Sequence, residues 1–274
     1  MKKTLCLAPL CLWLAVFVVF PLIIVVYYAF TSEGAGGIVL SLNNFSRFFD
    51  ETYIKVFVRS IRVAFYATVV CLLLGYPVAY IIARGKIKHK EIALLMIMLP
   101  MWMNFLLRTY SWLSLLENSG LINSMLTAFG FSKVQFLYNE KAVIFGTVYN
   151  FLPFMITPIQ STLLKLDGSL LEAAGDLGAN PVKSFLKITL PFSVPGIFSG
   201  IAMVFVPSVT TFVISQFMGG GNVPLIGDII EKQFRLVNDW HFGSAISMVV
   251  MVIVLVFMYI INSGDDNEEG RGMY

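Results

Sequence analysis

Six apolar stretches of about 20 residues each constrain this fold more than any other feature of the sequence. A stretch of that length crosses the hydrocarbon core of a bilayer as a single α-helix. Charged residues make up only 13% of the chain, against about 25% in soluble domains, and 58% of the residues are hydrophobic. We therefore predict an all-α membrane bundle of six transmembrane helices. The predicted spans are approximately Leu5–Phe30, Ile61–Ala83, Ile92–Leu116, Ala142–Leu164, Phe192–Ile214 and Gly243–Ile261.

The distribution of Lys and Arg predicts that both termini face the cytoplasm. Short cytoplasmic loops are enriched in these residues, and the loop Arg84–Lys90 carries four of them. Lys2 and Lys3 precede the first span, whose apolar run exceeds the roughly 7–15 residues of a signal-peptide core. We therefore expect that span to be retained. The expected organisation is an N-terminal helix with an external loop (1–59), a membrane domain that holds the other five spans (60–262) and a disordered acidic tail (263–274).

Several function classes find no support in the sequence. The two histidines, His89 and His241, lie outside the predicted spans, and the three cysteines show no paired spacing, so we expect neither a metal site nor a disulfide framework. Basic residues do not interleave with aromatic ones outside the apolar stretches, so we expect no nucleic-acid partner. The glycine run at 219–221 lacks the Lys-Ser/Thr ending of a phosphate-binding loop. The chain itself therefore lacks the motifs of an ATPase.

The polar segment 165–191, between the fourth and fifth spans, is predicted to form two short helices. Ser169 and Glu172 have the spacing of a capping box, which predicts a helix from about Leu170. Gly178 suits the left-handed position that ends a helix. Asn180 and Pro181 are typical of the start of a second helix, which Leu190 and Pro191 are expected to end before the next span.

An apolar stripe on the first of these helices needs a partner surface. Leu170, Leu171, Ala174 and Leu177 recur at helical spacing. An apolar stripe on a polar loop buries against the membrane interface, against the bundle itself or in the groove of another protein. The residues alone leave these three alternatives open.

The same segment resembles the EAA loop of binding-protein-dependent type I ABC importer permeases. Glu172-Ala173-Ala174 is followed at the family spacing by Gly178 and by Ile188-x-Leu190-Pro191. The resemblance implies that the loop docks a partner ATPase dimer, which binds ATP and Mg, and that this chain binds no cofactor. The implied docking residues are Leu170, Leu171, Glu172, Ala173, Ala174, Asp176, Leu177, Gly178, Ile188 and Pro191.

Two further segments, Leu99–Tyr110 and Met218–Gly243, are similar to spermidine/putrescine permeases of that family. The resemblance implies a permease in the cytoplasmic membrane of a prokaryote, moving polyamines by alternating access. It also implies a second homologous permease, an extracytoplasmic polyamine-binding protein and surrounding membrane lipid as partners. Importers of sulfate or molybdate, phosphate or iron share the loop and form the alternative. A membrane enzyme or channel is the other class, but no histidine lies in a span to serve as a base.

A path for polycations needs carboxylates and aromatic faces, because a cation over a ring gains about 0.5–2 kcal/mol. Arg108 is awkward for such a path, and the sequence leaves open whether it reaches the outer interface or pairs with an acid. The candidate path residues are Trp102, Asn104, Tyr110, Glu117, Tyr149, Asp228 and Glu231.

Overall fold

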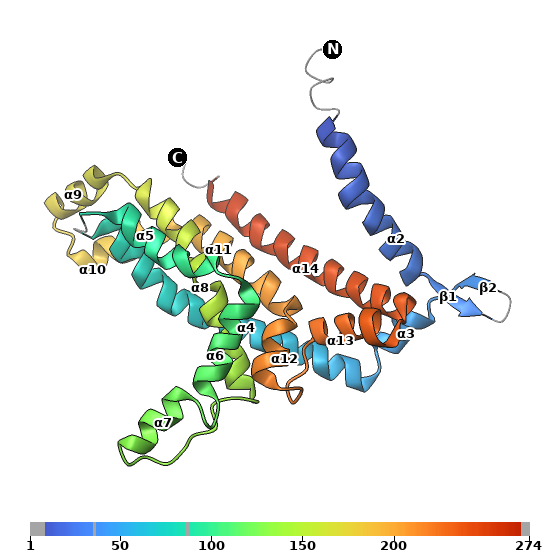
Figure 1. Ribbon diagram of the computed structural model, residues 1–274. Coiled ribbons are helices and arrows are strands. Elements are labelled where there is room, and N and C mark those ends of the chain that lie inside the picture. The colour runs from blue at the N-terminus through green and yellow to red at the C-terminus, as the bar shows by residue number, and fades with distance from the viewer. Residues whose placement is uncertain (1–8, 35–36, 86–87, 270–274) are drawn as a thin grey trace, which may run out of the picture.

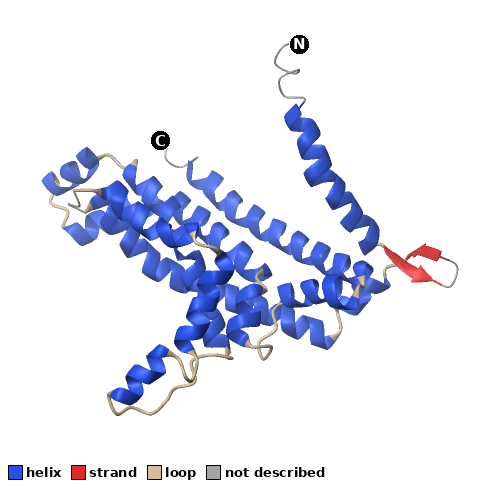
Figure 2. Ribbon diagram, viewed as in Figure 1, coloured by secondary structure: helices blue, strands red, loops and turns tan. Residues whose placement is uncertain are grey.

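The computed structural model describes residues 9–34, 37–85 and 88–269. Helices dominate these residues, and the strands are confined to one small hairpin (Figure 2). Lys2, Lys3, Cys6, Lys86 and the last tail residues, on which some of the expectations fell, lie outside the described ranges. The long helices are α2 (Phe20–Ala29, the end of the helical span Pro9–Ala29), α4 (Glu51–Arg84), α8 (Glu140–Leu164), α11 (Leu190–Thr210) and α14 (Trp240–Glu269).

Shorter elements connect these helices or bend away from them (Figure 1). Two antiparallel strands pair Thr31 with Leu40 and Gly34 with Gly37. The shorter elements are β1 (Thr31–Gly34), β2 (Gly37–Leu40), α3 (Asn43–Phe48), α5 (Lys90–Met98), α6 (Phe105–Leu116), α7 (Leu121–Ala128), α9 (Gly168–Asp176), α10 (Pro181–Ser184), α12 (Val213–Gly219) and α13 (Ile226–Lys232), with single 3₁₀ or π turns at η1 (Ala15–Val19), η2 (Leu99–Trp102), η3 (Phe185–Thr189) and η4 (Gln233–Val237).

Small residues let the central helices α4, α8 and α11 pack closely. Every fourth residue of α4 facing α8 is small, which is the pattern that brings membrane helices together. A side chain added at Gly200 of α11 would come within 2.7 Å of the sulfur of Met155 on α8. Gly75 of α4 has the same residue as its neighbour, at 3.1 Å. The buried small stripe of α4 is Ala67, Cys71, Gly75, Ala79 and Ala83.

The third predicted span is not one straight helix. Five helices are long and apolar enough to cross a membrane, and a sixth crossing requires the pair Lys90–Trp102 and Phe105–Ala128, which meet at 88°. Pro100 lies in the turn η2 just before the bend, and a proline removes a backbone donor from the helix. Asn104 then starts α6 by accepting the N–H groups of Leu106 and Leu107. The expectation of a continuous span at Ile92–Leu116 was therefore wrong at its centre.

Three other predicted boundaries differ from the structure. The fifth span begins at Pro181, ends at Thr210 and breaks at the extended residue Thr211, so Ile214 belongs to the separate helix α12. The predicted domain boundary at residue 59/60 falls inside α4. The tail was expected to be disordered from residue 263, but α14 continues to Glu269. A single glycine in that stretch costs a helix only about 1 kcal/mol, so a long preceding helix propagates through it.

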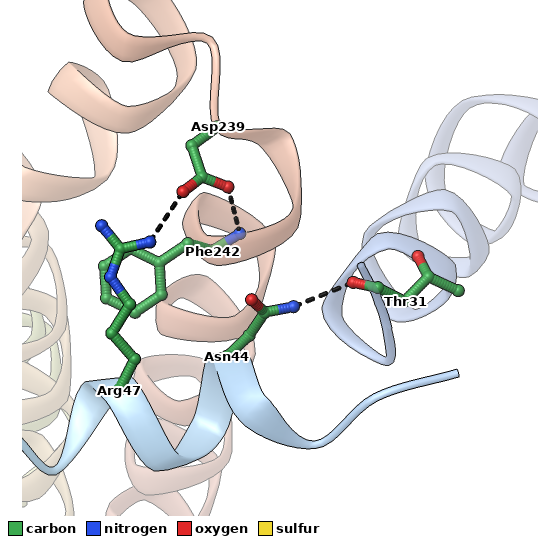
Figure 3. A network of polar contacts seen from close by, with 5 residues as sticks. All are labelled: Thr31, Asn44, Arg47, Asp239 and Phe242. Atoms are coloured by element: carbon green, nitrogen blue, oxygen red, sulfur yellow. Dashed lines mark hydrogen bonds and ion pairs between the residues drawn. The ribbon is translucent and has the colours of Figure 1, made fainter. Parts of the chain in front are cut away.

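The first and last long helices are joined near the β-hairpin by a polar network (Figure 3). Arg47 of α3 pairs with Asp239 at 2.8 Å, and its guanidinium lies 3.9 Å from the ring centre of Phe242 in α14. Asn44 of α3 donates to the carbonyl of Thr31, which follows α2. In the same region α2 and α14 run antiparallel (Figure 1), so the beginning of α2 and the end of α14 lie toward the same side.

Candidate functional site

The helix α9 begins two residues earlier than the capping-box prediction placed it. Its N-cap is Asp167, whose carboxylate accepts the backbone N–H of Ser169 at 3.0 Å. That backbone hydrogen bond, together with one from the Ser169 hydroxyl, lowers the pKa of the exposed Asp167. The capping role predicted for Ser169 and Glu172 was therefore wrong. Asp and Ser are both good caps, so the residue types alone do not decide which of the two begins the helix.

The turn after α9 is stabilised as the glycine pattern predicted. Gly178 has a φ of +78°, in the left-handed region that a residue with a Cβ adopts only under strain. Its N–H donates to the carbonyl of Gly175 at 2.9 Å, and the N–H of Ala179 donates to Ala174 at 2.9 Å. This pair of bonds defines a Schellman motif. The next helix then starts at Asn180, which accepts the N–H of Lys183 at 2.8 Å, with Pro181 as its first residue.

The second helix of the segment does not end before the membrane span. It runs from Pro181 through the π turn η3 into α11, and the expectation that Leu190 and Pro191 end it was wrong. In the π turn the N–H of Leu190 donates to the carbonyl of Phe185, five residues earlier. This wider register precedes Pro191, which has no N–H to continue the ordinary α pattern. The segment is thus one short helix joined by a tight turn to the extension of a membrane helix.

The segment is attached to the end of α4 by three contacts. Phe185 packs edge-on against two tyrosines of α4, with ring centres 5.9 Å from Tyr76 and 5.6 Å from Tyr80. The hydroxyl of Tyr76 lies 3.0 Å from that of Ser193 in α11. Arg84, at the end of α4, donates to the carbonyl of Leu166 at 3.0 Å. The apolar contacts of Phe185 thus point inward, toward the bundle.

The outer face of the same segment remains apolar and uncovered within this chain. Leu177 is 88% exposed and Leu170 is 50% exposed, whereas Leu171 and Ala174 of the predicted stripe are half-buried. Val182 and Leu186 on the second helix are also exposed. Of the other predicted docking residues, Glu172, Ala173, Asp176, Gly178 and Pro191 are exposed and Ile188 is half-buried.

At the other end of the bundle, a polar cluster joins α12 to α13. One carboxylate oxygen of Asp228, Oδ2, accepts the Ser215 hydroxyl at 2.6 Å and the Leu225 N–H at 2.7 Å. The other, Oδ1, is buried without a hydrogen-bond partner among the described residues. Burial raises the pKa of Asp228, against the opposing effect of these hydrogen bonds. Glu231 accepts from Gln216 of α12 at 3.3 Å and pairs with Arg235 at 2.9 Å.

The remaining candidates for the substrate path are dispersed. Asn104 and Glu117 cap opposite ends of the 12-residue helix α6, about 18 Å apart, so they cannot hold one small ligand together. Trp102 is 81% exposed, and Tyr110 is 55% exposed with its ring edge-on to Phe217 of α12. Tyr149 is half-buried against Trp112. The structure therefore brings Asp228 and Glu231 together around α12 and leaves the other five apart.

Arg108 adopts neither of the two arrangements left open by the sequence. Its side chain is buried, its guanidinium donates to the carbonyl of Pro100 at 3.0 Å, and it lies 6.0 Å from the ring centre of Tyr149. Glu117 is exposed at the far end of the same helix. Arg108 thus links α6 to the turn η2 across the bend, where the carbonyl of Pro100 also accepts the Met103 N–H at 3.2 Å.

Comparison with known proteins identifies the family. Residues 10–262 match the model of the binding-protein-dependent transport system inner membrane component. The chain belongs to this family. It is 37% identical to the spermidine/putrescine transport system permease protein PotB of Haemophilus influenzae, over 90% of this chain and 89% of that protein, and 37% identical to Escherichia coli PotB, over 90% and 92%.

Solved structures share the fold of this transport component. A bacterial ABC transporter that imports the acidic polysaccharide alginate superposes with a TM-score of 0.74 at 20% identity, covering 97% of this chain and 95% of that one. The same kind of transporter in complex with an alginate pentasaccharide-bound periplasmic protein gives a TM-score of 0.71 at 18% identity, covering 96% and 93%. The fold is therefore that of an ABC importer's membrane domain.

Sequence reasoning missed several residues that position the candidate sites of this transport component. Asp167 could have been found, since it precedes Ser169 by only two positions and both are good caps. Ser215 and Gln216 could not, because they meet Asp228 and Glu231 only after the chain reverses between α12 and α13. The same holds for Tyr76, Tyr80 and Arg84, which are distant in sequence from the loop that they hold.

Proposed function

We propose that this chain is the permease subunit of an ATP-driven importer that moves polyamines such as spermidine and putrescine across the cytoplasmic membrane of a prokaryote. The observation that carries the proposal is the 37% identity to PotB proteins along 90% of the chain. The names of those relatives specify spermidine and putrescine. Importers of sulfate or molybdate, phosphate or iron are the alternative, and the uptake experiment below tests sulfate directly.

The power for transport comes from a partner ATPase dimer that seats on α9 and the start of the α10–α11 helix. Four exposed apolar side chains on adjacent helices, around a tight turn at Gly178, form a surface that fits a groove in another protein. Small residues beside them, Ala173 and Gly175, let the partner's backbone approach. ATP and Mg bind to that ATPase, and this chain holds neither.

The helix geometry supports a direct mechanical link from the docking surface to the membrane. Because α10, η3 and α11 are continuous, a movement at Pro181 carries α11 with it as far as the break at Thr211. Beyond that break, the bond from Ser215 to Asp228 couples α12 to α13. Closure of the ATPase dimer would thus reach the far end of the bundle, which is what alternating access requires.

The orientation of the chain follows from charge. The Arg84 hydrogen bond to Leu166 places the cation-rich loop after α4 beside the docking segment, so both lie at one end of the bundle. Cation-rich short loops face the cytoplasm, which is also where ATP is found. Six crossings, with the bent pair counted as one, then leave both termini in the cytoplasm.

On this orientation the cluster of Asp228 and Glu231 lies at the outer side. Two carboxylates there suit a substrate with several ammonium groups, and Oδ1 of Asp228, which is buried without a partner among the described residues, would accept a hydrogen bond if the cluster opened to the substrate. The proposed partners at that side are a second homologous permease and a polyamine-binding protein. The alginate importer's complex with its periplasmic protein supports a partner of that kind.

Uptake by vesicles containing the complete reconstituted importer tests the substrate. The uptake of labelled spermidine, putrescine and sulfate is measured with and without ATP on the side of the membrane that the ATPase faces. We expect ATP-dependent uptake of at least one polyamine and none of sulfate. ATP-dependent sulfate uptake without polyamine uptake would show that the substrate assignment is wrong.

A pair of matched variants tests the docking surface separately. Leu177→Asp places a charge on the most exposed leucine of α9, whereas Leu42→Asp does the same to a leucine that is 66% exposed at the start of α3. We expect the ATPase to co-purify with the Leu42→Asp permease but at least about tenfold less with Leu177→Asp, since truncating or charging an interface anchor costs more than about 1 kcal/mol. Glu172→Lys is expected to keep insertion but uncouple ATP hydrolysis from uptake. Equal ATPase recovery with both aspartate variants would place the docking surface elsewhere.

A further inference from the structure

A hydrophobic groove of about 640 Å³ opens on the surface of the bundle between α4, α11 and α14. Its size is within the range of sites that hold small molecules. The floor includes Phe205 of α11 and Phe257 of α14, whose ring centres are 4.2 Å apart. All but one of its lining residues are apolar: Phe57, Val58, Ile61, Arg62, Phe65, Tyr66, Phe205, Ile253 and Phe257.

A second, polar hollow of about 340 Å³ adjoins the first at the beginning of α4. The two share Val58 and Arg62 as lining residues, and the second adds Ile54, Lys55 and Arg59. The three cations follow one another at spacings of four and three residues, so they lie on one face of the helix. The combined cavity is therefore amphipathic, with its cations at one end and its apolar walls further along α4.

The ion pairs around the polar hollow leave one cation uncompensated. Arg62 is held by a two-bond contact with Glu140 of α8, at 3.0 and 2.6 Å. Lys55 pairs with Glu51 at 2.6 Å, but both side chains are largely exposed, so that pair is weak. Arg59 is half-buried and forms no ion pair with any residue that the structure describes. An occupant with a negative charge would complete this group.

The position along the helix indicates what kind of molecule that is. With 34 residues, α4 is about 51 Å long and exceeds the roughly 30 Å of bilayer hydrocarbon. Its first turns, with Lys55 and Arg59, therefore lie toward the head-group region, and the apolar walls at Ile61–Tyr66 lie deeper. Head-group charge outside and hydrocarbon inside is the arrangement of a phospholipid.

We propose that this cavity is a specific site for a glycerophospholipid with an anionic head group. Arg59 and Lys55 contact the head group, and an acyl chain fills the apolar groove along α4. A transmembrane helix of another subunit is the competing occupant, but it would need an acidic side chain opposite Arg59, whereas anionic head groups are already present at that depth of the bilayer. The lipid would bridge α4, α11 and α14, and of these α11 is the helix that connects the docking segment to the far end of the bundle.

Native mass spectrometry of the complete importer, with defined lipid added, tests the proposal. Phosphatidylglycerol is compared with zwitterionic phosphatidylcholine of the same acyl chains. The double variant Lys55→Gln/Arg59→Gln leaves the Arg62 pair intact, and Lys133→Gln/Lys232→Gln removes the same charge from exposed residues elsewhere. We expect preferential retention of phosphatidylglycerol, weakened about tenfold or more only in the first variant, since each cation near a membrane surface contributes roughly a fivefold preference for anionic lipid.

A second variant separates the lipid site from a general effect of charge. Val58→Trp fills the junction of the two hollows without changing the charge, and it should also reduce the retention of phosphatidylglycerol while the complex stays assembled. Equal retention of the two lipids, or the same loss in both charge variants, would overturn the proposal. Cross-linking of Phe65→Cys to the second permease subunit, with no lipid retained, would likewise overturn it by assigning the groove to a protein partner.

Discussion

Two aspartates perform the same task at two helix starts, in opposite environments. Asp167 and Asp228 each accept a backbone N–H at the beginning of a short helix. Asp167 is in solvent and hydrogen bonding lowers its pKa, whereas Asp228 is half-buried and burial raises its pKa. At Asp167 the ionised carboxylate therefore stabilises the folded state at neutral pH. At Asp228, hydrogen bonds to the carboxylate oppose the desolvation that raises its pKa, a conflict that is typical of a functional acid.

The structure assigns the N-cap of α9 to Asp167, whereas the capping-box prediction assigned it to Ser169, and the two assignments predict different effects of alanine substitution. If Asp167 is the cap, Asp167→Ala lowers the melting temperature of the detergent-solubilised permease more than Ser169→Ala does. Because the folded-state pKa of Asp167 is lowered, its contribution is present at neutral pH and is lost as the pH falls through that pKa. The difference between Asp167→Ala and the wild type should accordingly vanish in acid. A larger effect of Ser169→Ala at neutral pH would restore the original assignment.

At Asp228 the expected pH dependence has the opposite sign. Since burial raises the folded-state pKa, the unfolded chain loses its proton first, and stability falls as the pH rises from the unfolded pKa to the folded one. Asp228→Asn keeps an oxygen for Ser215 and Leu225, so it should melt at or above the wild-type temperature at neutral pH and lose this pH dependence. Asp228→Ala should cost about 0.5–2 kcal/mol, as for other lost caps.

The variant Asp228→Asn also distinguishes a role of the carboxylate in transport from its role in stability. If the carboxylate of Asp228 contacts the polycation, Asp228→Asn lowers uptake in reconstituted vesicles despite its unimpaired stability. Unchanged uptake by Asp228→Asn would limit the role of this residue to capping α13.

At the scale of elements, the apolar periodicity predicted most of the long helices but not how they are interrupted. Stretches of about 20 apolar residues indicate a span because the bilayer imposes that length. The bend after η2 and the continuity of α10 with α11 depend instead on how single prolines are accommodated. Pro100 accompanies a break of 88°, whereas Pro191 is absorbed by a π turn. The local sequence does not distinguish these outcomes, because the surrounding helices supply the compensating contacts, such as Arg108 at Pro100.

Continuity between α10 and α11 leads to a prediction at this scale. Two glycines inserted after Ser184 should interrupt the rigid connection, because glycine is a poor helix former, while leaving Leu177 and Val182 exposed for docking. We expect the ATPase to co-purify normally with this variant, but ATP-dependent uptake should be lost. The same insertion after Gly130, in the loop following α7, is the control and should leave uptake unchanged. Full uptake by the Ser184 insertion would mean that force is transmitted by another element.

At the scale of the whole molecule, helices from the two ends of the chain are secured to each other through α3. Arg47 of α3 reaches Asp239 and Phe242 at the start of α14, and Asn44 and His241 both contact the segment around Thr31 that follows α2 (Figure 3). The association is polar and local to the hairpin end, and it adds to the contact between α2 and α14. The contacts that Arg47 and Thr31 make with the start of α14 could not be predicted from the sequence, because those partners are 192 and 210 residues apart, whereas Asn44 and Thr31 are separated by only 13.

Asp239 both pairs with Arg47 and caps α14, and three substitutions can separate these two contributions to stability. Asp239 Oδ2 accepts from Arg47, while its Oδ1 accepts the Phe242 N–H at 3.0 Å and caps α14. Arg47→Gln and Asp239→Asn each remove the ion pair, which at this exposure contributes only about 0.2–1 kcal/mol. Arg47→Gln also removes the cation–π contact with Phe242, which contributes about 0.5–1 kcal/mol. Asp239→Ala also removes the cap, at a further cost of about 0.5–2 kcal/mol. Melting temperatures should therefore decrease in the order wild type, then Asp239→Asn, then Asp239→Ala, and Arg47→Gln should melt below Asp239→Asn because it also loses the contact with Phe242. The difference in melting temperature between the wild type and Asp239→Asn should shrink at high salt, because exposed ion pairs are screened. The difference between Asp239→Asn and Asp239→Ala should persist. Equal melting of the two Asp239 variants would mean that the ion pair alone secures α14 to α3.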